Sequence, residues 1–164
     1  MNKTFLWNWH IVVIETAKKI AENYGIEHET ISLPFLNEIT KNSFVGGEYS
    51  VSNTEFGTNE SMKSVWVPNR NGLFLNIAAA IADAKNYTHI VFGANKTEAK
   101  TFSDNTKEFV LSINNEFKYS TMNGVEVVAP LIDYDKIDIV RFALEQNIPL
   151  ELAYSCYRNG EKNC

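Results

Sequence analysis

The sequence predicts an α/β fold built on an open parallel sheet with helices on both faces. Short runs of β-branched and aromatic residues, such as HIVFG (89–93) and VEVVAPLI (125–132), alternate with segments of helical periodicity. Such alternation is typical of βαβ units, whose strands pair in parallel through right-handed crossovers. The chain has 164 residues, of which 45% are hydrophobic, enough for one domain with a core. We therefore predict a single α/β domain over residues 1–164.

The first part of the chain predicts a strand, a helix, a second strand and a short helix. Residues 3–6 can form a short strand. From Ile11 apolar residues recur at helical spacing as far as Tyr24, and Gly25 is a typical helix stop. IEHETISL (26–33) favours a strand, and FLNEI (35–39) after a proline favours one or two helical turns.

Residues 41–66 are rich in Gly, Ser, Asn, Thr and Glu, and they show no periodicity. A segment of that length without a pattern, inside a compact domain, is usually a functional or mobile loop. We predict a mobile loop here.

The segment VPNRNGLFLNIAAAIADAKNYTHIVFG (67–93) predicts a loop, a buried helix and a buried strand. One helix face would carry four apolar residues: Leu73, Ile77, Ile81 and Ala84. The opposite side is nearly as apolar, so the helix should be covered on more than one side. HIVFG suits an interior strand of a parallel sheet. Ligands of open α/β sheets collect at the carboxyl ends of strands, so chemistry is expected just after residue 93.

The remaining elements follow the same pattern. Phe109, Ile113 and Phe117 lie in register on a predicted helix over 106–119, with Asn105 and Glu108 as a capping pair. Residues 125–132 predict a buried strand. The next helix begins at Asp135 and should bury an apolar stripe formed by Ile137, Val140 and Leu144.

Composition narrows the function classes. The formal charge is −5 and no basic block is present, so the chain lacks the electrostatic footprint of a nucleic-acid binder, and a small-molecule ligand is favoured. The sequence contains neither a membrane-length apolar run nor an apolar leader at its start. We predict a cytoplasmic protein without direct nucleic-acid or membrane partners.

Several polar residues follow the predicted helix start and strand end. Arg70 could clamp a carboxylate or phosphate bidentately, or it could be an ordinary solvated first-turn arginine. Asn95, Glu98 and Asp104 lie just beyond the predicted strand, where helix capping and loop hydrogen bonding explain them as well as a ligand site does. Both interpretations remain open at this point.

Two cysteines, Cys156 and Cys164, lie near the end of the sequence on either side of YRNGEKN (157–163). A tetrahedral zinc site needs four nitrogen or sulfur ligands. The pair by itself supplies half of one, so either free thiols or a metal site would fit.

Three segments together resemble one enzyme family. They are VPNRNGLFLNIAAAIADA (67–84), HIVFGANKTEAKTFSDNTKEFV (89–110), and VVAPLIDYDKIDIVRFALEQNIPLELAYSCY (127–157) with NGEKNC (159–164). These residues look like 7-cyano-7-deazaguanine synthase, the nitrile-forming enzyme of queuosine biosynthesis. The resemblance extends upstream through HIVVIETAKKIAENYGIEHETISLPFLNEI (10–39) and covers nearly the whole chain.

The resemblance implies an adenine nucleotide alpha-hydrolase-like fold of the ATP pyrophosphatase type. Such an enzyme uses ATP and Mg²⁺ to adenylate 7-carboxy-7-deazaguanine, lets ammonia displace AMP, and dehydrates the resulting amide to the nitrile. It also implies that Cys156 and Cys164 are ligands of a structural Zn²⁺. By position, five residues would bind the nucleotide or the deazapurine: Arg70, Asn71, Asn95, Asp104 and Lys136.

The sequence also departs from the family pattern. The family's first strand, its Ser-Gly-Gly-x-Asp-Ser phosphate loop and the helix that follows have no match here, and the family adds two cysteines after the position of Cys164. We therefore expect an incomplete synthase with a partial zinc-binding tail at 154–164, acting as a homodimer or with a complementing fragment. The alternatives are a non-catalytic binding subunit, half of a split enzyme, or another ATP pyrophosphatase-type enzyme that forms amides or thiolates tRNA.

Overall fold

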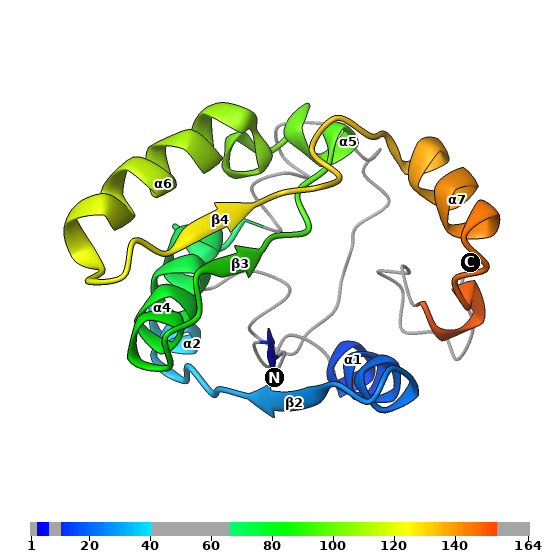
Figure 1. Ribbon diagram of the computed structural model, residues 1–164, viewed down its shortest axis with the longest axis horizontal. Coiled ribbons are helices and arrows are strands. Elements are labelled where there is room, and N and C mark those ends of the chain that lie inside the picture. The colour runs from blue at the N-terminus through cyan, green and yellow to red at the C-terminus, as the bar shows by residue number, and fades with distance from the viewer. Residues whose placement is uncertain (1–2, 7–10, 41–65, 154–164) are drawn as a thin grey trace.

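A computed structural model describes residues 3–6, 11–40 and 66–153 (Figure 1). Most of the predicted loop over 41–66 lies outside these ranges, as do Cys156 and Cys164. None of the described helices combines the length and the apolar character that a membrane span requires.

The first part of the described chain is a βαβ unit, as predicted. β1 (Lys3–Leu6) pairs in parallel with β2 (Glu27–Thr30), and α1 (Ile11–Asn23) connects them. Gly25 follows α1 with a φ of 62°, a left-handed conformation that costs glycine little. The short helix α2 (Phe35–Ile39) comes next.

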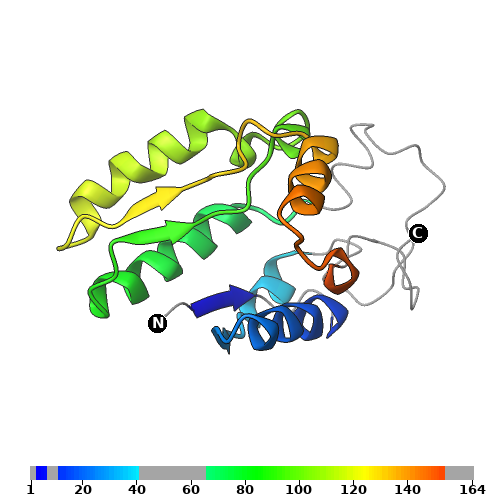
Figure 2. The same ribbon diagram turned by 45° about the vertical axis from the view of Figure 1, so that its right-hand side comes forward.

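The second part is a larger βαβ unit preceded by a helix. α4 (Arg70–Ala84) leads to β3 (His89–Val91), and α6 (Lys107–Ser120) connects β3 to its parallel partner β4 (Glu126–Val128). The small helices α5 (Lys96–Ala99) and η1 (Ser103–Asn105) lie between β3 and α6. After β4 come α7 (Lys136–Glu145) and η2 (Leu150–Leu152). The turned view separates the two strand pairs and shows α7 beyond the ends of β3 and β4 (Figure 2).

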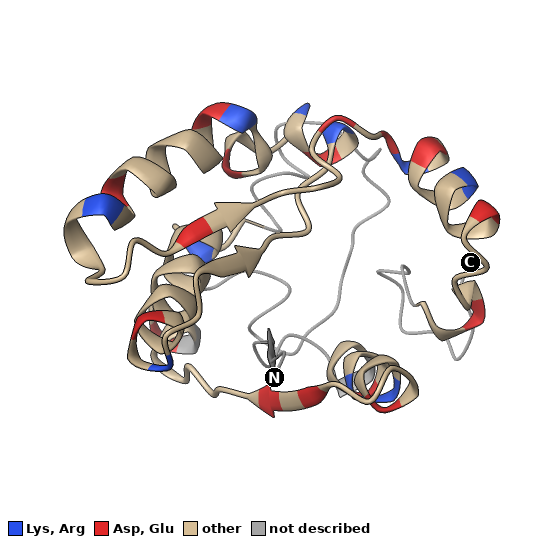
Figure 3. Cartoon of the chain, viewed as in Figure 1, with Lys and Arg blue, Asp and Glu red and all other residues tan. Residues whose placement is uncertain are grey.

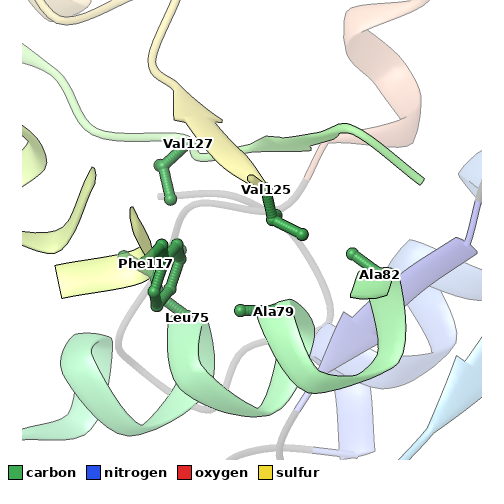
Figure 4. Close-up of a cluster of buried hydrophobic side chains, with 6 residues drawn as sticks. All are labelled: Leu75, Ala79, Ala82, Phe117, Val125 and Val127. Carbon is green, nitrogen blue, oxygen red and sulfur yellow. The ribbon is translucent and has the colours of Figure 1, made fainter. Parts of the chain in front are cut away.

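The main core lies between one face of the β3–β4 pair and the helices α4 and α6 (Figure 4). Phe117 of α6 is fully buried there, against Leu75 of α4 and Val127 of β4. A smaller cluster joins Leu36 of α2 to Val67, with Leu73 and Phe74 of α4 packed against it. Contacts on two faces of α4 confirm that this helix is covered on more than one side.

The helix face predicted for α4 is wrong in detail. Its most buried apolar residues are Leu75, Ala79 and Ala82, whereas Leu73 is only half-buried and Ala84 is exposed. Because α4 is apolar all round, periodicity alone could not show which face meets the sheet.

Four further expectations are corrected. Val91 of β3 is 73% exposed, because among the described residues the core helices pack on the opposite face of the strand pair. The helix α6 is capped by Thr106, whose hydroxyl accepts from the Phe109 N–H, and not by Asn105. The predicted stripe on α7 is exposed, with Ile137 at 70%. β4 covers only residues 126–128, near the start of the strand predicted over 125–132.

The parallel pairing predicted from the alternation of elements is confirmed in both strand pairs. Among the described strands the pairs are separate, β1 with β2 and β3 with β4. Their union in a single sheet stays a prediction.

Candidate functional site

Polar side chains gather where the chain leaves the carboxyl ends of β3 and β4 and where α4 begins. The start of α4 is shaped by Asn69, whose φ of 53° is left-handed, a conformation that asparagine tolerates better than most residues. A side chain in place of Gly72 would collide with the Asn69 carboxamide, so glycine allows this turn to close. The turn places Arg70 and Asn71 in the first positions of α4.

Asn71 links the start of α4 to the loop after β3. Its side chain is buried, and its Nδ2 donates to the backbone carbonyl of Asp104 over 3.4 Å. The Oδ1 of Asp104 accepts from the Nδ2 of Asn105 over 3.1 Å. Two of the predicted binding residues, Asn71 and Asp104, are thereby brought together although 33 positions separate them.

Asn95 follows β3 and caps α5. Its Oδ1 accepts from the backbone N–H groups of Thr97 and Glu98, each over 3.1 Å. This geometry supports the capping interpretation of Asn95. The Nδ2 of the same side chain has no hydrogen-bond partner within residues 3–6, 11–40 and 66–153, so it can still bind a ligand.

Lys136 begins α7 and ties the exit of β4 to the exit of β3. Its Nζ lies 2.6 Å from the Oε1 of Glu98, and its backbone N–H donates to the Thr97 hydroxyl over 3.1 Å. Nearby, the Lys96 N–H donates to the carbonyl of Tyr134 over 2.9 Å. The contacts of Lys136 therefore join α7 to α5.

Asp135 caps α7 in a capping box with Asp138. The helix therefore begins within one residue of the start predicted at Asp135. Its Oδ1 accepts from the N–H groups of Ile137 and Asp138. Hydrogen bonds to the charged form favour that form. The Asp138 N–H, followed by the Ile137 N–H and the charge of Lys96, lowers the pKa of Asp135 below its ordinary value of 3.8, although desolvation opposes them.

An aromatic pair joins the same two segments as the Asn71–Asp104 contact. The Trp66 and Phe102 rings are stacked, with centroids 6.0 Å apart and planes 18° from parallel. Neither ring was predicted from the sequence as part of the site, and nor was Thr97. Only their closeness in sequence to the predicted site residues could have indicated them. Trp66 directly precedes VPNRN, and Phe102 and Thr97 belong to the polar loop after β3.

Charged residues are spread along the helices, and most of the β3–β4 pair is uncharged (Figure 3). A surface cavity of about 300 Å³ lies beside α7, but it contains none of the predicted binding residues. It is lined by Asp133, Tyr134, Asp138, Arg141, Phe142 and Glu145.

Within the described ranges, no three His, Cys, Asp or Glu side chains are grouped as a metal site would require. The predicted zinc ligands, Cys156 and Cys164, lie outside those ranges.

Parallel strands with polar loops at their carboxyl ends define an α/β protein of the general kind that binds small ligands at this edge. Comparison with known proteins specifies the family. A family model described as "Queuosine biosynthesis protein QueC" matches residues 7–164. The chain belongs to the QueC family.

Curated relatives agree with this assignment. The chain is 46% identical over 156 residues to the 7-cyano-7-deazaguanine synthase of Carboxydothermus hydrogenoformans, covering 92% of this chain and 73% of that protein. It is 44% identical over 161 residues to the synthase of the same name from Methanosarcina barkeri, covering 92% of this chain and 70% of that protein. The Methanosarcina mazei synthase is 43% identical over the same length and share.

Proposed function

We propose that this chain is a 7-cyano-7-deazaguanine synthase of queuosine biosynthesis, which converts 7-carboxy-7-deazaguanine and ammonia to the nitrile with ATP. The family membership and the similarity to three synthases of that name support the reaction. The observation that best supports the location of the site is the contact between Asn71 and Asp104, because it joins the VPNRN segment to the loop after β3.

The chemistry requires activation of a carboxylate. A carboxylate is a poor electrophile until one of its oxygens becomes part of a good leaving group, and adenylation supplies AMP as that group. In this proposal Arg70 holds the substrate carboxylate or a phosphate, since its planar guanidinium matches both in a bidentate manner. Ammonia then displaces AMP, and a second activation allows the amide to lose water.

Asn95 and Asp104 suit the edges of a nitrogen heterocycle. The Nδ2 of Asn95 is a donor, and within the described part of the chain only the Oδ1 of the Asp104 carboxylate has a partner. The second Asp104 oxygen can therefore accept from a ring N–H or an exocyclic amine. Lys136, held by Glu98, places a positive charge at the exit of β4, where it favours a phosphate.

The finer fold assignment is also a proposal. We place β1–β2 and β3–β4 in one open parallel sheet of the adenine nucleotide alpha-hydrolase-like type, with helices on both faces. The exposed Val91 and the exposed Ile137 support this, because each leaves apolar surface that such a sheet would cover. We also propose that the protein acts in the cytoplasm and pairs as a homodimer or with a complementing fragment.

Two metals belong to the proposal. Mg²⁺ is bound by one or two carboxylates together with substrate phosphates, so the phosphates of ATP would supply part of its coordination. Thiolates are preferred zinc ligands, so Cys156 and Cys164 would hold a structural Zn²⁺ with further ligands. Its contribution is to fix the chain around the two cysteines.

The test is AMP formation from ATP by the purified chain with Mg²⁺, 7-carboxy-7-deazaguanine and ammonium, with the nitrile followed by mass spectrometry. One arm uses the chain alone. The other adds a polypeptide that carries the Ser-Gly-Gly-x-Asp-Ser strand, loop and helix typical of the family. We expect substrate-dependent AMP and nitrile in at least one arm.

The matched variants are Arg70→Ala and Arg141→Ala. Loss of one charged, bidentate contact costs about 2–3 kcal/mol, a rate loss of about 30- to 150-fold, so Arg70→Ala should be the affected variant. Arg141 pairs with Asp138 on the exposed surface of α7 and should be dispensable. A folded chain that forms no nitrile in either arm would contradict the proposed reaction.

A further inference from the structure

Among the described residues, the stacked pair of Trp66 and Phe102 lies outside the two hydrophobic clusters that form the core. Neither ring belongs to the cluster around Phe117 or to the cluster around Leu36. Trp66 remains 39% exposed, so the largest aromatic side chain near VPNRN keeps much of its surface in water. Exposed indole surface beside a polar site is typical of a binding residue more than of a core residue.

The position of the pair is set by the segments that carry the proposed site. Trp66 directly precedes Val67, which is buried against α2 and α4 and so holds this end of the segment in place. Phe102 is the N-cap residue of η1, which contains Asp104. The ring stack and the Asn71–Asp104 hydrogen bond therefore connect the same two segments side by side.

This arrangement combines a flat apolar surface with polar groups in the same two segments. Asp104 follows Phe102 by two positions and Asn71 follows Trp66 by five, and Asp104 has an acceptor oxygen without a partner among the described residues. A planar heterocycle satisfies both features, since its face stacks on an aromatic ring and its edge forms hydrogen bonds. A flexible or purely charged ligand would use the polar groups or the apolar surface, but not both.

We propose that Trp66, backed by Phe102, is the stacking platform for the bicyclic base of a substrate of this site. This inference rests on the proposed function, which supplies two ligands with such a base: the deazaguanine of 7-carboxy-7-deazaguanine and the adenine of ATP. Phe102 is a positioning residue, because it holds the indole plane by stacking on it. Trp66 is the residue that contacts the base.

The experiment uses tryptophan fluorescence, because the chain has only three tryptophans, Trp7, Trp9 and Trp66. In a Trp7→Phe, Trp9→Phe background, Trp66 is the sole reporter. We expect saturable quenching by 7-carboxy-7-deazaguanine or by ATP, titrated separately, and the ligand that quenches identifies the base on the platform. Calorimetry on the unsubstituted chain measures both affinities independently of fluorescence.

Variants separate binding from folding. Trp66→Leu should weaken binding of the stacking ligand about 10- to 100-fold, the range expected for loss of one base–aromatic stack. Trp66→Phe should retain most of the affinity, because it keeps an aromatic face. Tyr119→Leu removes an aromatic that is 86% exposed at the far end of α6 and should leave binding unchanged. Thermal melts check that each variant is folded.

The outcomes separate the stacking platform from the proposed reaction. Binding by calorimetry with no quenching, and with Trp66→Leu within about twofold of the parent, would overturn the platform and leave the proposed function standing. Saturable quenching of Trp66, with binding by calorimetry weakened in Trp66→Leu, in a protein that forms no AMP in either arm of the assay, would support the platform and contradict the proposed reaction. If neither ligand binds the folded chain, the platform is overturned.

Discussion

The two ends of the β3–β4 pair are stabilised in different ways. Along the strands, α4 and α6 bury apolar side chains against one face, with Phe117 fully enclosed. Beyond the carboxyl ends, α5, η1 and α7 are joined by caps, side-chain hydrogen bonds and an ion pair, while the apolar stripe of α7 is exposed. The first region is held by apolar burial, and the second by directional polar contacts.

A binding site is expected at the polar end of the β3–β4 pair. Apolar burial tolerates little change and leaves no polar group for a ligand. The polar end keeps donors and acceptors near the surface, such as the Asn95 amide. Substitutions should therefore affect stability strongly in the first region and weakly in the second, where binding should respond instead.

The largest effect is expected for Phe117→Ala. Removing a fully buried aromatic ring leaves a cavity between α4 and β4, and such changes cost about 3–5 kcal/mol of unfolding free energy. Urea denaturation followed by circular dichroism measures it. The control is Tyr119→Ala on the same helix, which should stay within about 0.5 kcal/mol of the parent. Equal losses in both variants would contradict the assignment of the core.

Asn114→Ala should come next. The Asn114 carboxamide donates to the carbonyl of Val127 and accepts from its N–H, over 2.9 and 2.7 Å, and so it occupies the edge of β4 turned away from β3. Leaving these two backbone groups unsatisfied costs about 2 kcal/mol. We expect faster hydrogen exchange at the Val127 amide and a lower urea midpoint.

Asn115→Ala is the matched control for that change, since Asn115 is the exposed neighbour on α6. It should alter neither the exchange of the Val127 amide nor the midpoint. Unchanged exchange in Asn114→Ala would show that the edge of β4 does not depend on this side chain.

Much of the fold could be predicted from sequence, because strong periodicity and a helix stop act locally. The helix predicted from Ile11 to Tyr24 is α1, one residue shorter, with Gly25 left-handed after it. The choice of face on α4 failed, because a helix apolar all round offers no contrast. The cap of α6 failed because Asn105 is taken up by η1, which leaves Thr106 in the capping position.

The candidate site was harder to predict than the fold. Asn95 and Asp104 were noted as polar residues beyond the predicted strand, and the capping contacts of Asn95 follow a local rule. Asn71 came from the family resemblance alone. Asn71 meets Asp104 across 33 positions, a contact that depends on how α4 and the loop after β3 are placed. Trp66 and Phe102 pair in the same way, so neither ring stood out in the linear sequence.

A smaller effect is expected at the polar end, in the pair formed by Lys136 and Glu98. A double-mutant cycle with Lys136→Met and Glu98→Gln should give a coupling free energy of about 0.5–1 kcal/mol, because Glu98 is largely shielded from water. The comparison cycle uses Lys107 and Asp133, which lie equally close but are both well exposed. Its coupling should be lower. If the exposed pair couples more strongly, shielding of Glu98 does not strengthen the link between α5 and α7.

The smallest effect concerns the cap of α7 and appears only in acid. The pKa of Asp135 is lowered in the folded protein, chiefly by the Asp138 N–H, so the unfolded chain binds the proton more readily. The contribution of the Asp135 charge is therefore present above the ordinary pKa of 3.8 and is lost as the pH falls through the lower folded value. Asp135→Ser keeps a capping oxygen but cannot titrate. Urea midpoints measured from about pH 5 to about pH 2.5 should fall more steeply for the parent than for Asp135→Ser. Parallel curves would mean that the capping box stabilises α7 through hydrogen-bond geometry and not through charge.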